Sequence, residues 1–72
     1  MKPEQATDLR NRFSYHVPKG DQVERYAALR ARALEFAMFI ADSTPVSREQ
    51  SIALTALEQV VFAANAAIAR NE

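Results

Sequence analysis

The chain has 72 residues, no cysteine, one histidine, and nine basic against nine acidic residues, so its formal net charge is zero. This length allows one small domain, and the composition excludes a disulfide framework, a thiolate zinc site and a metal site made only of histidines from one chain. The balanced charge argues against binding a polyanion by bulk electrostatic attraction, although it does not exclude a local basic pocket.

Residues 1–20 are predicted to form an N-terminal arm that ends in an aromatic loop. Proline is tolerated in the first turn of a helix, so Pro3 can begin a short helix of one or two turns. Residues 13–20 contain two aromatic side chains and the only histidine, which is too many for a simple linker. Because Pro18 restricts the backbone of Val17 to extended geometry, we expect an ordered loop here.

Residues 21–42 are predicted to form the first long helix. Asp21 is the expected N-cap, and Pro45 ends the helix because proline cannot continue one. The apolar residues recur with helical spacing and form one broad face. That face comprises Val23, Tyr26, Leu29, Ala33, Phe36, Ala37 and Ile40.

Residues 46–70 carry the strongest helix signal in the chain. Ser47 as N-cap with Gln50 three residues later is the S-x-x-Q form of the capping box. From residue 60 to residue 69 the helix is apolar almost all round, with Asn65 as its one polar side chain, so it must be buried on every side. Two apolar stripes run along it, one of Leu54, Leu57, Val61, Ala64 and Ile68, the other of Ala53, Ala56, Val60, Ala63 and Ala67.

Two helices of similar length joined by so short a connection fold back antiparallel. The sequence therefore predicts an all-α class, with a two-helix hairpin over residues 21–72 and the arm of residues 1–20 before it. In one chain the alanine stripe and positions such as Phe39 and Phe62 would stay in water. Because burying a large apolar side chain is worth roughly 1.5–3 kcal/mol, we expect a homo-oligomeric helical bundle. Asn65 is the residue expected to fix register across that interface.

No apolar run reaches the about 20 residues that cross a bilayer, because charged residues interrupt each stretch. The N-terminus has no apolar segment behind Lys2, so it does not read as a signal peptide. We therefore expect a soluble, cytoplasmic protein without a membrane partner.

No catalytic constellation is evident, so we expect no enzyme, no cofactor and no metal. His16 is interpreted as a ligand contact or a loop-ordering hydrogen bond, with an exposed loop histidine as the alternative. Tyr15 carries a hydroxylated ring beside basic residues, which is the kind of group that stacks on bases. Arg30 lies beside the apolar face, either snorkelling from an interface edge or aimed at a phosphate. Arg48 lies in a first helical turn, where free N–H groups favour an anion.

Four stretches of the segment from residue 16 to residue 72 are distinctive: His16–Gln22, Arg25–Arg30, Ser47–Thr55 and Asn65–Glu72. With them the segment resembles a family of phage-encoded sponge proteins that counter CBASS and Thoeris immunity by sequestering cyclic-nucleotide signals. The resemblance implies compact homohexamers of short helices with ligand pockets between protomers.

The same resemblance implies roles for three residues. A tyrosine before the first long helix stacks on a base in the better-known sponges, and Tyr15 matches its position. Arg30 matches a basic residue supplied by another protomer, but the family pattern has lysine there, which changes the geometry of the contact. Arg48 matches an arginine of a second pocket. His16 and Lys19 complete the expected ligand-binding set.

The preferred interpretation is a phage anti-defence protein that binds a cyclic di- or trinucleotide and sequesters it without cleavage in the cytoplasm of the host cell. The alternative is a phage helical oligomerisation or scaffold module that binds a protein partner through its apolar faces. A helix-turn-helix protein is the least favoured reading, and no DNA partner is expected, because the last helix presents alanines where base-reading polar side chains are needed.

Overall fold

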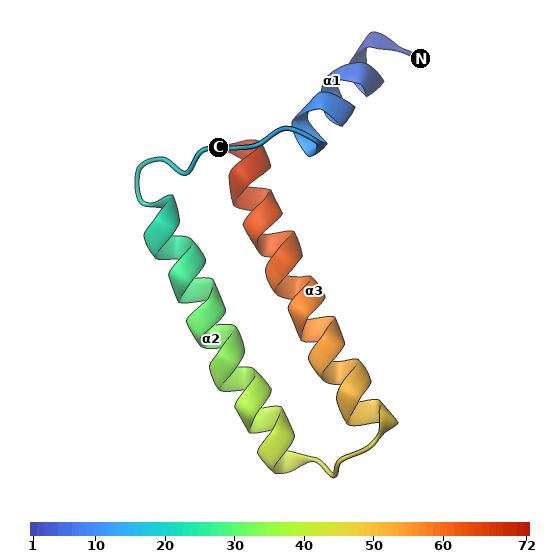
Figure 1. The fold of residues 1–72 in the computed structure, drawn as a ribbon, viewed down its shortest axis with the longest axis vertical. Helices are drawn as coiled ribbons and strands as arrows, with labels where there is room; N and C mark the ends of the chain where they lie inside the picture. The colour runs from blue at the N-terminus through green and yellow to red at the C-terminus, as the bar shows by residue number, and fades with distance from the viewer.

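The computed structural model describes residues 1–72 as three helices with no strand (Figure 1). Helix α1 spans Pro3–Arg12, α2 spans Gln22–Ser43 and α3 spans Arg48–Asn71. Helices α2 and α3 lie side by side and antiparallel, and α1 projects from the open end of this hairpin (Figure 1). The predicted all-α class and hairpin are confirmed. Helix α1 has ten residues, more than the one or two turns expected from the sequence.

The connected end of the hairpin is fastened by two side chains. The backbone at Ser47 is extended, and its hydroxyl accepts a 3.1 Å hydrogen bond from the N–H of Gln50, as the capping-box motif predicts. The amide of Gln50 does not reach back to Ser47. It donates instead to the carbonyl oxygens of Ala41 at 3.3 Å and Thr44 at 3.1 Å, so it joins α3 to the end of α2.

The side-chain contacts at the start of α2 differ from the predicted N-cap. Asp21 occupies the N-cap position, but its side chain caps no backbone N–H and instead pairs with the Nε atom of Arg25 at 3.2 Å. The Oε1 atom of Gln22 accepts a 3.1 Å hydrogen bond from the backbone N–H of Lys19. Gly20 turns the chain here with a φ of 56°, a left-handed conformation that favours glycine.

Helices α2 and α3 meet along a narrow seam of half-buried side chains. The first of the two predicted stripes on α3 lies on this seam, as expected. On α2 the face is narrower than predicted, because Val23 and Phe36 remain 59% and 54% exposed. The apolar seam residues are Tyr26, Leu29, Ala33, Ala37 and Ile40 from α2, and Ala53, Leu54, Leu57, Val61, Ala64 and Ile68 from α3.

One chain alone has no hydrophobic core. Only Gln22 is buried, and it is polar. The molecule measures 49 × 31 × 13 Å, and its radius of gyration of 16.0 Å exceeds the about 11 Å of a compact domain of this length. Its accessible surface is 5832 Å², against about 4,500 Å² for a compact monomer of this mass. The side chains of Phe39 and Phe62 are exposed, as predicted for a single chain.

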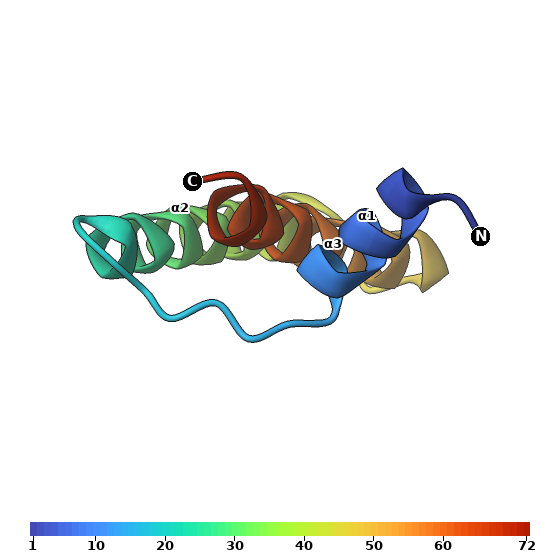
Figure 2. The same cartoon turned by 90° about the horizontal axis from the view of Figure 1, so that it is seen from above.

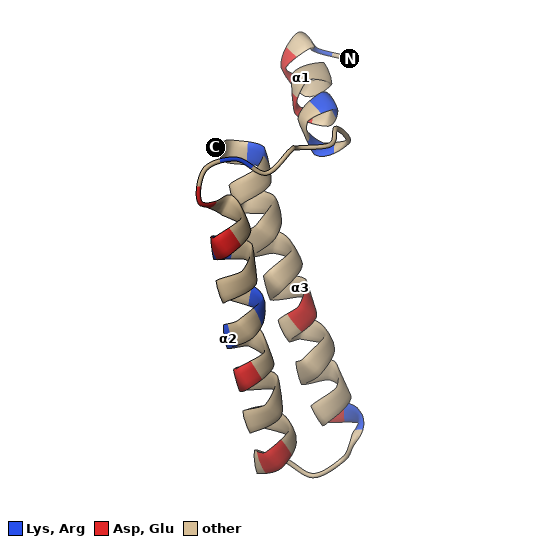
Figure 3. Ribbon diagram, turned by 60° about the vertical axis from the view of Figure 1, so that its left-hand side comes forward, with Lys and Arg blue, Asp and Glu red and all other residues tan.

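Charged residues are sparse on α3, which is mostly free of them between its two ends (Figure 3). By length and composition alone this 24-residue helix could cross a membrane, so the expectation that no segment passes that test was wrong. Glu58 does interrupt the apolar run, but one charge does not offset so many apolar residues. A single such helix is weak evidence for a membrane span, because helices that pack in soluble proteins have the same composition.

Candidate functional site

A cavity of about 390 Å³ lies at the open end of the hairpin. Figure 2 shows the loop between α1 and α2 passing on one side of the α3 end, and residues of this loop form one wall of the cavity. Its volume is within the range of about 300–1,000 Å³ that is common for small-molecule sites. The lining residues are Arg12, Ser14, Tyr15, His16, Tyr26, Arg30, Asn65, Ala66, Ala69 and Arg70.

The cavity is lined by basic residues and by no acidic residue. Three of its ten lining residues are arginines and none is acidic, although the whole chain has no net charge. Arg30 forms no ion pair within the chain, whereas Arg12 pairs with Asp8 at 3.0 Å on the exposed surface of α1. Exposed pairs of this kind are weak. The cavity is therefore suited to an anion, and guanidinium groups bind phosphate well.

Two tyrosine rings complete the chemistry of the cavity. Tyr15 comes from the loop and is 83% exposed, so its ring is open to a ligand. Tyr26 comes from α2 and is half-buried against the hairpin. An exposed aromatic ring beside basic groups is the arrangement that stacks on a nucleobase while the phosphate is neutralised nearby.

His16 orders the loop. Its Nε2 atom donates a 2.8 Å hydrogen bond to the backbone oxygen of Asn11, and the side chain is half-buried. The amide of Asn11 in turn donates to the backbone oxygen of Arg70 at 3.1 Å. Of the interpretations drawn from the sequence, the loop-ordering hydrogen bond is the one that the structure shows. A direct ligand contact of His16 stays a prediction.

Asn65 lines the cavity from α3, and its Oδ1 atom is buried without a hydrogen-bond partner in the chain. A buried acceptor left unpaired costs about 1–3 kcal/mol. Within one chain nothing satisfies it. An acceptor left free in this way is available to a second protomer, and the role of Asn65 in fixing register across an interface stays a prediction.

The structure brings together Tyr15, His16 and Arg30, but it places the other two predicted site residues elsewhere. Lys19 does not line the cavity, and its backbone N–H is engaged with Gln22. Arg48 lines a separate shallow hollow near the connected end of the hairpin, together with Ser51, Ile52, Thr55 and Ala56. A second pocket at Arg48 therefore stays a prediction for a site distinct from the first.

Five polar or aromatic lining residues were not predicted from the sequence as members of the site: Arg12, Ser14, Tyr26, Asn65 and Arg70. Helical spacing does put Asn65, Ala69 and Tyr26 on the sides of α3 and α2 that face one another. Their nearness to Tyr15 depends on the path of the loop, for which the sequence has no periodic signal.

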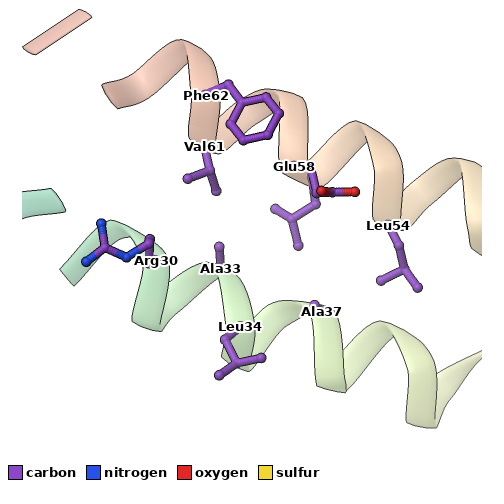
Figure 4. A pocket seen from close by; sticks show the side chains of 9 residues that line it. Arg30, Ala33, Leu34, Ala37, Leu54, Glu58, Val61 and Phe62 are labelled. Carbon is purple, nitrogen blue, oxygen red and sulfur yellow. The ribbon is translucent and has the colours of Figure 1, made fainter. Parts of the chain in front are cut away.

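An apolar groove of about 380 Å³ adjoins the basic cavity between α2 and α3 (Figure 4). Arg30 belongs to both, and Figure 4 shows it at one end of the groove, with Phe62 and Glu58 projecting from α3. Seven of the nine residues that line the groove are hydrophobic. Arg30 thus marks the boundary between a polar cavity and an apolar surface.

At the end of the hairpin that carries the cavity, α2 is joined to the end of the chain by an ionic clasp, formed by Gln22, Arg25 and Glu72. Both Nη atoms of Arg25 donate to the carboxylate of Glu72, with Nη1 at 2.8 Å from Oε2, and Gln22 Nε2 donates to Oε1 at 3.1 Å. These hydrogen bonds, with smaller help from the charges of Arg25 and Lys19, lower the pKa of Glu72 to about 2. The same pairing raises the pKa of Arg25.

Comparison with known proteins gives one family. The family model described as Acb2/Tad1, hairpin domain, matches residues 5–69, which is all but the first four and the last three residues. The matched range includes every lining residue of the basic cavity except Arg70. No individual curated protein and no solved structure matches the chain significantly.

Proposed function

The chain belongs to the Acb2/Tad1 hairpin-domain family, the family of phage cyclic-nucleotide sponges, and from this premise we propose that its basic cavity binds a cyclic oligonucleotide. The family implies a phage anti-defence role in which a cyclic nucleotide is bound. For this chain the proposal is that a cyclic di- or trinucleotide immune signal is sequestered in the cytoplasm of the host cell, with neither cofactor nor DNA involved.

The observation that carries the proposal is the composition of the cavity. Three guanidinium groups, two phenol rings and no carboxylate surround one hollow of a chain whose overall charge is zero. A cyclic dinucleotide presents two phosphates and two bases in a compact ring, so it needs cations and aromatic faces close together. Stacking is worth roughly 1–3 kcal/mol per base, and each charge-assisted hydrogen bond about 1.5–3 kcal/mol.

Binding without cleavage is supported by the polar groups that are present. No carboxylate lines the cavity, and the Nε2 atom of the one histidine is already hydrogen-bonded to the Asn11 carbonyl. Hydrolysis of a phosphodiester needs a group that activates water or protonates the leaving oxygen. Sequestration needs only contacts, and the arginine and tyrosine residues supply those.

Self-association is part of the same proposal. One chain exposes Phe39, Phe62 and the alanine stripe of α3, and it has no core of its own. We propose a homo-oligomer, with the hexamer of the family as the preferred form. Tyr15 and Arg30 already line one cavity in a single chain, so a neighbouring protomer would add further walls to that cavity.

Calorimetry with a panel of cyclic di- and trinucleotides tests the proposal on protein whose assembly has been verified. Tyr15→Ala and Arg30→Ala should each weaken binding by about tenfold or more, the loss of one stacked base or one charged hydrogen bond. The matched controls are Phe13→Ala, an equally exposed aromatic outside the cavity, and Arg32→Ala, an exposed arginine of the same helix outside the cavity. Neither control should change affinity.

The ligand must also be recovered intact after the complex is denatured, because a linearised product would identify a nuclease. If properly assembled protein gives no heat with any cyclic nucleotide, the second candidate function is favoured. That candidate is a helical scaffold that binds a protein partner. The apolar groove lined by Leu34, Leu54 and Phe62 among others is the observation that supports it.

A further inference from the structure

The single buried residue of the chain is a glutamine. In a small helical protein the most buried side chains are ordinarily aliphatic, yet Gln22 is only 4% exposed and no hydrophobic residue is buried. A buried amide is tolerated when both of its ends are hydrogen-bonded. Both ends of Gln22 are, and they are bonded to parts of the chain far apart in sequence.

The two ends of this amide contact different segments. Nε2 donates to Oε1 of Glu72 at 3.1 Å, and Oε1 accepts from the backbone N–H of Lys19 at 3.1 Å. The backbone N–H of Gln22 also donates to the carbonyl of Lys19 at 3.0 Å. Gln22 therefore links the end of α3 to the loop that precedes α2.

The ionised carboxylate of Glu72 determines which way this amide points. A carboxylate only accepts hydrogen bonds, so the NH₂ group of Gln22 must face Glu72. The carbonyl end is then directed at Lys19, where the one available backbone group is a donor. Arg25 holds the carboxylate of Glu72 in place from the other side.

The loop in question is the one that carries Tyr15. It is tied at three points, by hydrogen bonds from Ser14 to the Arg10 carbonyl, from His16 to the Asn11 carbonyl and from the Lys19 N–H to Gln22. Gly20 adds a left-handed turn directly after Lys19. Tyr15 itself is exposed, so these ties decide where its ring lies relative to Arg30.

We propose that Glu72 is a positioning residue for the ligand cavity: through Gln22 it fixes Lys19, and with it the loop that presents Tyr15. Glu72 is not among the lining residues of the cavity and forms its hydrogen bonds with Gln22 and Arg25 only, and it lies outside the range matched by the family model. The effect on ligand binding depends on the proposed function, whereas the effect on the loop does not.

The experiment compares Glu72→Ala with Asp21→Ala in the full-length, assembled protein. Asp21 pairs with the same arginine but its side chain forms no hydrogen bond with Gln22, so it controls for loss of an ion pair at Arg25. Amide hydrogen exchange by NMR reports the Lys19 N–H directly. Calorimetry with the cyclic dinucleotide that wild type binds best reports the cavity.

In Glu72→Ala the Lys19 amide should exchange about fivefold to tenfold faster, the effect of losing one hydrogen bond, while amides in the middle of α2 and α3 keep their rates. Asp21→Ala should leave the Lys19 amide unchanged. Affinity should fall severalfold in Glu72→Ala alone. The double variant Gln22→Glu with Glu72→Gln swaps the amide and the carboxylate, so a donor again faces an acceptor. This variant should restore much of the slow hydrogen exchange of the Lys19 amide.

Uniformly faster exchange along both long helices would mean that Glu72 only stabilises the hairpin, and this would overturn the proposal. Faster exchange of the Lys19 amide together with an unchanged affinity for the ligand would also overturn the proposal. If wild type binds no cyclic nucleotide but the Lys19 amide still responds selectively, the proposed function fails while the link from Glu72 to the loop stands.

Discussion

Ser47 and Gln50 are joined by one hydrogen bond in the first turn of α3, but their side chains serve different helices. The hydroxyl of Ser47 accepts the Gln50 N–H at 3.1 Å and so caps α3. The side chain of Gln50 leaves that turn and donates to the last carbonyls of α2, at Ala41 and Thr44. The end of one helix and the start of the next are thus one hydrogen-bonded unit.

Removing the two groups should therefore have unequal effects. Ser47→Ala should lower the free energy of unfolding by about 1 kcal/mol, the usual loss for an N-cap. Gln50→Ala should cost more, because several hydrogen bonds of about 0.5–1.5 kcal/mol each are lost. Thermal melting of both variants beside Ser51→Ala, an exposed serine with no side-chain hydrogen bond, measures this. Equal melting temperatures for Gln50→Ala and Ser51→Ala would contradict the role given to Gln50.

Gly20 is the one residue with a positive φ. Gly20→Ala should destabilise the protein by about 1–2 kcal/mol, since the left-handed conformation brings a Cβ atom close to the backbone. No neighbouring atom lies within 4 Å of that Cβ position, so the cost is conformational and does not come from crowding. Denaturant unfolding measures it, with Lys19→Ala as the adjacent control. A neutral Gly20→Ala would show that this turn relaxes freely.

The clasp at Glu72 should produce a defined pH dependence. Its pKa is about 2 in the folded chain against an ordinary value of 4.5, so its contribution to stability is present above pH 4.5 and is lost as the pH falls toward 2. The melting-temperature difference between wild type and Glu72→Gln should be constant above pH 4.5 and shrink as the pH falls from 4.5 toward 2. Glu24→Gln, at a carboxylate without an ion pair, provides the control. A difference that does not change with pH would argue against the ionised clasp.

Assembly is tested on the exposed side of α3. Ala63 and Ala67 face away from α2, so Ala63→Leu and Ala67→Leu add no crowding inside one hairpin. In a close-packed oligomer the same changes should weaken association, because overpacking typically costs about 1–3 kcal/mol. Analytical ultracentrifugation at several micromolar concentrations should show smaller species for both variants. A stable, folded wild-type monomer throughout that range would refute self-association.

Much of the fold could be predicted because helical periodicity and end signals are local. Ser47 and Pro45 place the turn between the helices, and the stripe from Leu54 to Ile68 identifies the side of α3 that packs on α2. Two predictions were wrong for different reasons. Phe36 was assigned to the apolar face because apolar character does not distinguish a face buried within one chain from one left for a partner. Charged residues were given too much weight as breaks in an apolar helix.

The site was predicted only in part. Tyr15 and Arg30 were singled out from their residue types and from the family resemblance, and the structure places both at one cavity. Arg12 and Arg70 join them because the loop crosses the open end of the hairpin, which is a non-local relationship. Gln22 links Lys19 to Glu72, which lies 50 positions from Gln22 in the sequence. No short motif predicts a contact between residues so far apart.

The short connection between α2 and α3 also determines the order in which contacts between these helices form during folding. Four residues separate these helices, so their joined ends meet with little loop-closure entropy and the hairpin propagates from there toward the open end. Among the hydrogen bonds that join the two arms of the hairpin, those of Glu72 with Gln22 and Arg25 are the most distant in sequence, so they should form last. Fraying runs in the opposite direction, so the basic cavity lies in the part of the hairpin that closes last and opens first.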